Sequence, residues 1–129
     1  MNKKLPISAT ILSCTLLLGV TTAILAADAP TAPEASPEVY KILAENKQWR
    51  VMEATWQPGQ EDNFHSHTAD RVSLFVTDCK LRLSKPNGKY KDVNPKAGKA
   101  KARTGKPVKA HKAKNIGDKV CIIRIVELK

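Results

Sequence analysis

The sequence predicts an all-β domain that closes as a sandwich or a barrel, preceded by an N-terminal segment of a different kind. Two observations predict this fold class: short runs of strand-forming residues recur from residue 39 to the end of the chain, and Gly, Pro and Asn turns separate them. The sequence after residue 47 contains neither a repeat nor a convincing helical pattern. The chain has 129 residues, which is the length of one domain.

Residues 1–27 have the features of a secretory signal peptide. The basic start MNKK precedes the apolar stretch ISATILSCTLLLGVTTAILAA, which ends in small residues. Cleavage is expected after Ala26 or Ala27, which predicts a periplasmic or secreted protein with no stable membrane span after processing. A retained anchor and a lipoprotein signal at ILSC are the alternatives. Residues 28–38, DAPTAPEASPE, are rich in Pro and Ala and predict a flexible arm before a β-barrel over 39–129.

Each expected strand is a run of β-branched or aliphatic residues bounded by turn signals. In chain order the segments are VYKILAEN (39–46, strand or short helix), WRVMEATW (49–56), RVSLFVT (71–77), CKLRLS (79–84), YKDV (90–93), a loop or weak edge strand (94–107), VKAHKAK (108–114) and KVCIIRIVELK (119–129). The Asn-Gly pair in KPNGKY predicts a hairpin turn before YKDV. The aliphatic core is expected to contain Leu74, Val76, Leu81, Leu83, Ile122, Ile123, Ile125 and Val126.

The charge is strongly positive and unevenly distributed. The net charge is +10, and it is +8 without the signal peptide, from 20 basic and 12 acidic residues. From Lys80 to Lys114 there are 13 Lys or Arg and one acid, Asp92. Such a domain attracts anions, so the expected partner is a small anionic molecule or, alternatively, an anionic polymer bound by the Lys-rich segment 85–114. Nucleic-acid binding is not favoured, because Tyr90 is the only aromatic residue in the basic stretch.

Two cysteines, Cys79 and Cys121, remain after signal-peptide cleavage. An even number of cysteines in an oxidising compartment is compatible with a disulfide between them. Two small buried residues are the alternative, because a free cysteine packs as a small hydrophobe. The sequence leaves both interpretations open, since a disulfide requires a close approach of the two Cα atoms.

The candidate chemistry lies in His65, His67 and His111, which are all the histidines of the chain. His65 and His67 are two residues apart and point to the same face of an extended segment, and His111 lies on an alternating segment. Neutral imidazole is the commonest protein ligand of transition metals, so three of them predict a metal site. Solvent-exposed polar residues in a turn are the alternative.

The segment PGQEDNFHSHTADRVSLFVTDCKLRL resembles the first motif of the cupin superfamily, Gly-x5-His-x-His-x3,4-Glu-x6-Gly, with Gly59, His65 and His67 in place. HKAKNIGD resembles the end of the second motif, His-x3-Asn, at His111 and Asn115. The chain from residue 39 onward is similar to small single-domain cupins, some of them labelled beta-alanine degradation proteins. The resemblance implies a jelly-roll barrel with the histidines inside its mouth. Small cupins often dimerise, which makes a homodimer a further expectation.

The chain departs from these motifs where the metal ligands matter. Arg71 or Val72 stands in place of the motif's Glu, Asp78 replaces its last Gly, and the Pro-x-Gly of the second motif is not recoverable. The remaining three-histidine face is expected to hold one divalent metal such as Zn, Fe, Mn, Ni or Cu. Arg71 could instead bind a carboxylate of the ligand. Trp56 and Gln60 are further candidate ligand contacts, with core packing and a solvated loop as their alternatives.

Two function classes follow from these residues. The first is an exported binding protein that holds a small anionic ligand in the barrel mouth, with or without the metal. The second is a metal-dependent enzyme of the dioxygenase type, which the resemblance to three-histidine cupins implies. The sequence assigns no catalytic residue. Glu61 and Asp62 have the chemistry of an acid or base, but both are expected to be solvated loop charges.

Overall fold

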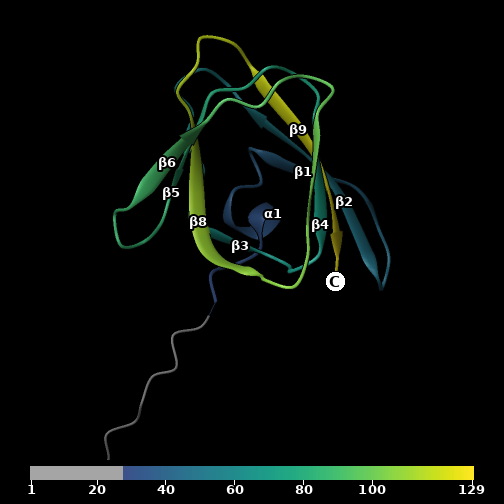
Figure 1. The fold of residues 1–129 in the computed structure, drawn as a ribbon. Helices are drawn as coiled ribbons and strands as arrows, with labels where there is room; N and C mark the ends of the chain where they lie inside the picture. The colour runs from purple at the N-terminus through teal and green to yellow at the C-terminus, as the bar shows by residue number, and fades with distance from the viewer. Residues whose placement is uncertain (1–27) are drawn as a thin grey trace, which may run out of the picture.

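The computed structural model of the protein describes residues 28–129, so the predicted signal peptide lies outside the described residues. Its strands are β1 (Tyr40–Glu45), β2 (Trp49–Trp56), β3 (His65–His67), β4 (Arg71–Phe75), β5 (Leu81–Ser84), β6 (Tyr90–Val93), β7 (Ala100–Arg103), β8 (Val108–Asn115) and β9 (Cys121–Leu128). Five strands pair in the order β1-β2-β9-β4-β7 and four in the order β3-β8-β5-β6. Figure 1 shows the two antiparallel sheets facing each other, which is the arrangement of the predicted jelly roll. Within residues 28–129, no helix is both long and apolar enough to cross a membrane.

Strand β9 organises the core because it pairs with β2 on one side and β4 on the other. Its inner face carries Cys121, Ile123, Ile125 and Glu127, all of them buried, while the residues between them are at least partly exposed. This two-residue alternation is typical of a strand with one buried face, and it places Ile122 and Val126, both predicted to be core residues, on the half-buried outer face. The buried core also includes Val39, Tyr40, Met52, Ala54, Trp56, Cys79, Leu81 and Ala113.

The face of strand β4 that points to the interior is not the predicted one. Leu74 and Val76, both predicted to be core residues, are 41% and 38% exposed. The register sets Arg71 opposite Glu127 and Phe75 opposite Ile123, so the odd-numbered residues point inward. The prediction was wrong because it assigned the more apolar face to the core. The interior beside β4 is a cavity that takes Arg71 and Ser73.

Residues 28–38 pack on the barrel, which corrects the prediction of a flexible arm. They contain the short helix α1 (Ala32–Ala35), whose capping box joins Thr31 to Glu34. Ala32 and Ser36 are buried, and the Pro30 carbonyl accepts a hydrogen bond from the Ser66 backbone N–H at 2.8 Å. Composition did not reveal this, because the contacts that order the segment come from distant parts of the chain.

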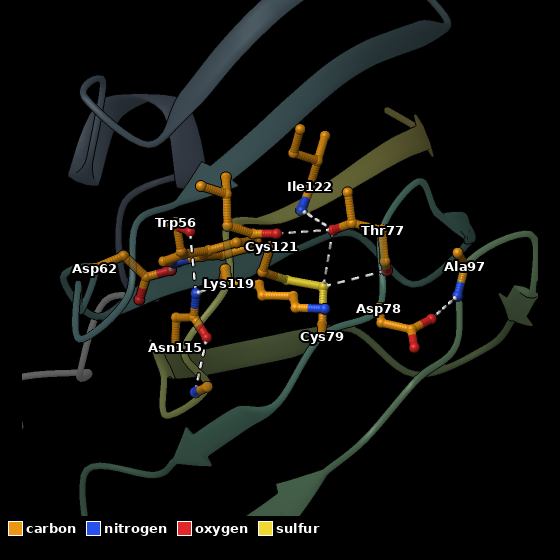
Figure 2. The surroundings of a disulfide bond; sticks show 12 residues. Trp56, Asp62, Thr77, Asp78, Cys79, Ala97, Asn115, Lys119, Cys121 and Ile122 are labelled. Atoms are coloured by element: carbon orange, nitrogen blue, oxygen red, sulfur yellow. Dashed lines mark hydrogen bonds between the residues drawn. A yellow bond between two sulfur atoms is a disulfide. The ribbon is translucent and has the colours of Figure 1, made fainter.

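Cys79 and Cys121 form a disulfide that joins the loop before β5 to the start of β9 (Figure 2). Both cysteines are buried. Near this bond, the Asn115 side chain donates to the carbonyls of Trp56 (3.1 Å) and Lys119 (2.8 Å). Asn115 therefore fixes the β8–β9 turn against β2, so its place in the second motif reflects a structural role.

Candidate metal centre

Three histidine side chains converge between the two sheets. His65 and His67 lie on β3 and His111 lies on β8, and the strand pairing sets His65 directly opposite His111. The candidate ligand atoms of the three side chains all lie within 4.8 Å of one another. His65 and His67 are buried and His111 is half-buried. The three-histidine face that the sequence predicted is therefore formed, and it could hold a metal ion.

Two of the histidines are oriented by hydrogen bonds on the side away from the cluster. The Nδ1 atom of His65 donates to the Asn63 carbonyl at 2.9 Å, and Nδ1 of His67 donates to Oε1 of Glu127 at 2.5 Å. A neutral imidazole that carries its proton on Nδ1 has its lone pair on Nε2. Both Nε2 lone pairs therefore face the cluster, and partners of this kind orient metal-binding histidines in general.

The nitrogens that face the cluster fit a cation. Nε2 of His65 and Nε2 of His67 lie 3.1 Å apart, and with both protons on Nδ1 no hydrogen lies between them. Nε2 of His111 is buried and has no hydrogen-bond partner among the described residues. Two nitrogens that bind one ion at about 2.1 Å lie roughly 3.0 to 3.4 Å apart. The donor set and the spacing of the His65–His67 pair therefore fit a divalent transition metal, and the ligand atom of His111 lies within 4.8 Å of that pair.

Asp62, predicted to be a solvated loop charge, is buried beside His65. Its carboxylate accepts hydrogen bonds from the Tyr40 hydroxyl (2.8 Å), from Nε1 of Trp56 (3.2 Å) and from a backbone N–H of β8 (2.6 Å). The prediction was wrong because these three donors come from other strands. The Tyr40 oxygen also lies 3.2 Å from Nε2 of His65, so Asp62 holds the phenol against the histidine cluster. Glu61, the neighbouring residue, is exposed as predicted.

Burial sets the protonation states at the centre. Burial and then the charge of His67 lower the pKa of His65 to about 4. Burial, followed by the charges of His67 and His65, lowers the pKa of His111 to about 2. Burial raises the pKa of Asp62 to about 6, although its hydrogen bonds act in the other direction. His65 and His111 are therefore neutral near pH 7, which is the form that binds metals.

His67 and His111 open onto a cavity of about 710 Å³ between the sheets, and His65 lies fully buried behind them. The apolar part of the cavity wall includes Phe75, Leu81, Leu83, Val93, Ile123 and Ile125. The basic residues of the wall are Arg71, Lys85, Lys89, Lys91, Lys101 and Arg103. Five of these cations come from the Lys-rich part of the sequence and are exposed, so they line the cavity where it meets solvent, whereas Arg71 is half-buried.

Two of the three predicted ligand contacts reach this cavity. Arg71 lies on the inner face of β4, and its Nη1 donates to the Thr68 carbonyl at 2.8 Å. Trp56 lines the cavity too, but it is buried and packs edge-on against Tyr40, with ring centroids 5.5 Å apart. Gln60 does not line the cavity. Its Oε1 accepts a hydrogen bond from the Gln57 backbone N–H in the β2–β3 loop, which corrects the predicted contact.

The sequence did contain a signal for the missing carboxylate. In CIIRIVEL the inward positions are Cys121, Ile123, Ile125 and Glu127, so an acidic residue falls on the buried face of a strongly apolar strand. Buried carboxylates are rare unless they are paired, and this one is paired with His67. The chain thus replaces the direct carboxylate ligand of the motif by a carboxylate behind one of the histidines.

No protein-family model and no curated protein matches this sequence. Solved structures do match it. A cupin domain from Bordetella pertussis Tohama I is 24% identical with a TM-score of 0.62, and the match covers 78% of this chain and 96% of that one. A sugar phosphate isomerase of the cupin superfamily from Silicibacter pomeroyi DSS-3 is 18% identical with a TM-score of 0.51 over 78% and 66% of the two chains.

A cupin-like protein from Thermotoga maritima MSB8 is 16% identical with a TM-score of 0.50, over 68% of this chain and 65% of that one. Identities this low establish the fold alone. The chain therefore has the fold of the small cupins, which confirms the predicted jelly roll and the resemblance on which it was based.

Proposed function

We propose that this protein is an exported cupin-fold binding protein that holds one divalent transition metal at His65, His67 and His111 and binds a small anionic ligand in the adjoining cavity. The observation that carries the proposal is the unpartnered, buried Nε2 of His111 beside the two facing Nε2 atoms of β3. A buried polar atom without a partner is costly, and a metal ion would satisfy all three nitrogens at once.

The surrounding residues support metal binding by holding the imidazoles in one tautomer. Glu127 accepts the Nδ1 proton of His67, and the Asn63 carbonyl accepts that of His65. Glu127 also supplies a negative charge behind the histidines that partly offsets the dication. A bound metal would act as a Lewis acid towards an anionic group of the ligand. Arg71 and the apolar wall would orient that ligand and exclude water from it.

Metal analysis tests the proposal directly. The purified protein is expected to contain about one equivalent of a transition metal by elemental analysis after loading and desalting, and the double variant His65→Ala, His67→Ala is expected to contain none. Gln60→Ala is the matched control, because Gln60 belongs to the same loop region but lies outside the cavity. Circular dichroism shows whether the double variant is folded. Absence of metal from the wild-type protein under every loading condition contradicts the proposal.

Export is a separate part of the proposal. The Cys79–Cys121 disulfide supports it, because disulfides persist in oxidising compartments. The intact mass of the protein recovered from the periplasm or medium is expected to correspond to cleavage after Ala26 or Ala27 and to two oxidised cysteines. An intact mass that includes residue 1, found only in the cytosolic fraction, contradicts export.

A further inference from the structure

The lining of the cavity carries more positive than negative charge among the described residues, although Arg71 lies opposite Glu127 in the sheet. Six Lys and Arg side chains line it, and none of its lining residues is Asp or Glu. Within residues 28–129, none of the six forms an ion pair. Some cations elsewhere are paired, as in Arg50 with Glu45 and Arg82 with Asp92, while others such as Lys99 and Lys109 are exposed without an ion pair in the described part of the chain. The lining of the cavity therefore has an excess of positive charge, accessible to an anion from outside.

Four of these six cations form one group, which we call the cationic cluster: Arg71, Lys91, Lys101 and Arg103. The β4–β7 pairing sets Arg71 directly opposite Arg103, and it sets Lys101 opposite Ser73 on the same inner face. Lys91 lines the same cavity from β6, close enough to Lys101 for its charge to lower the pKa of Lys101. Like charges directly opposite each other on a sheet are destabilising, so the fold retains this group at a cost.

The size of that charge indicates the class of anion. A single carboxylate is satisfied by one guanidinium in a two-pronged contact, which would leave the other cations uncompensated. A phosphoryl group carries up to two negative charges on three oxygens and suits several Arg and Lys donors at once. The apolar wall of Phe75, Leu83 and Ile125 lies in the same cavity and suits an organic group attached to the phosphate.

We propose that the cationic cluster binds the phosphoryl group of a small organic phosphate, whose apolar part lies along the aliphatic wall of the cavity. This inference deepens the proposed function, since it names the ligand class for the same cavity, but it does not require the metal. Arg71 and Arg103 would contact the phosphoryl oxygens from β4 and β7, and Lys101 and Lys91 would add charge from either side.

Isothermal titration with phenyl phosphate, inorganic phosphate and benzoate tests the inference. Phenyl phosphate is expected to bind at least tenfold more tightly than benzoate, which has the same ring but a single negative charge. Arg103→Gln and Lys101→Gln are each expected to weaken phenyl phosphate binding about tenfold or more, because each removes a charge-assisted contact. Lys99→Gln is the control: Lys99 directly precedes β7, is exposed and does not line the cavity, so its loss should change affinity less than twofold.

A bound metal could also attract phosphate, so the titrations are repeated with the His65→Ala, His67→Ala variant. Inorganic phosphate binding that persists there and still depends on Arg103 supports the inference even if the wild-type protein holds no metal. Any of three results overturns the inference. These are loss of all phosphate binding in the His65→Ala, His67→Ala variant, equal affinities for benzoate and phenyl phosphate, and an unchanged affinity of Arg103→Gln for phenyl phosphate. The metal content of Arg103→Gln is expected to equal that of the wild type, so a failure of one proposal is distinguishable from a failure of the other.

Discussion

The histidine centre and the cationic cluster share one cavity but differ in the sign of the charge that surrounds them. Behind the histidines the protein places two buried carboxylates, Glu127 and Asp62, which orient the imidazoles and their neighbours. Around Arg71 and Arg103 it places no carboxylate among the residues that line the cavity. The first region supplies negative charge and electron pairs and is prepared for a cation. The second has an excess of positive charge, with Glu127 as the one carboxylate opposite Arg71, and we propose that it binds an anion.

The largest effect is expected when a carboxylate is placed inside the cationic cluster, because this removes the charge difference between the two regions. Ser73 lies on the inner face of β4 opposite Lys101, so Ser73→Asp gives the cluster an internal partner. We expect phenyl phosphate affinity to fall by about 100-fold, because the new carboxylate repels the phosphoryl group and forms an ion pair with Lys101. Titration calorimetry measures the change. Leu74→Asp is the control on the outer face of the same strand, and a similar loss there would show that only the net charge of the protein matters.

Removing the Glu127 carboxylate behind the histidines should weaken metal binding at the histidine centre. Glu127→Gln keeps the shape of the side chain but loses the charge that holds the Nδ1 proton of His67. We expect metal affinity to fall by about 10- to 100-fold, as is usual for partners of metal-bound histidines. Competition with a chromophoric chelator gives the affinity. Glu53→Gln, which breaks only the exposed pair with Arg124, should leave it unchanged, and equal effects of the two variants would contradict the role assigned to Glu127.

The sequence predicted the parts of this site that depend on local pattern. The strand alternation was sufficient for an all-β sandwich or barrel, and the His-x-His spacing placed His65 and His67 on one face, because both follow from which side of a strand a residue points to. The jelly roll and the position of the histidines in its mouth came from the resemblance to the cupin motifs. The parts that failed depend on contacts between distant segments. Asp62 is buried by donors from three other strands, and Arg71 meets Arg103 only through the β4–β7 pairing.

The face of β4 shows a second reason for failure. Hydrophobicity assigned Leu74 and Val76 to the interior, but the interior beside β4 is a cavity lined by Arg71 and Ser73, so the rule fails here. Sequence patterns therefore predict strands more reliably than they predict which face is inside when the interior is a binding site. Glu127 was missed for a similar reason: each face of CIIRIVEL carries three apolar residues and one charged residue, so the pattern marks an acid in an apolar strand but does not say which face is buried.

Neutralising Asp62 should affect stability more than ligand binding. In Asp62→Asn an amide N–H₂ replaces one of the carboxylate oxygens, so at least one buried donor among Tyr40, Trp56 and the β8 backbone loses its acceptor. We expect the free energy of unfolding to fall by about 1–3 kcal/mol, as for other buried hydrogen-bonding groups left unpaired. Urea denaturation measures it. Glu61→Gln, which breaks the more exposed pair with Lys112, should change it by less than about 0.5 kcal/mol.

The smallest expected effect is the pH dependence of the free energy of unfolding of the metal-free protein. It tests whether the buried histidines affect this dependence more than the buried Asp62 does. The pKa values of His65 and His111 are lowered to about 4 and about 2, so between pH 6.5 and 5 only the unfolded chain takes up these two protons, and acidification destabilises the fold. The pKa of Asp62 is raised to about 6, so below that pH the folded state takes up one proton that the unfolded chain does not, which opposes the loss.

The net difference below pH 6 is therefore about one proton in favour of the unfolded state, or roughly 1.4 kcal/mol of stability lost per pH unit towards pH 5. Urea denaturation of the metal-free protein at pH 7, 6 and 5 gives the slope. His111→Gln removes one of the two histidine protons and should bring the slope close to zero, whereas Asp62→Asn removes the opposing proton and should roughly double it. A wild-type protein that gains stability as the pH falls from 6 to 5 would mean that the buried carboxylate, not the histidines, dominates the charge balance of the centre.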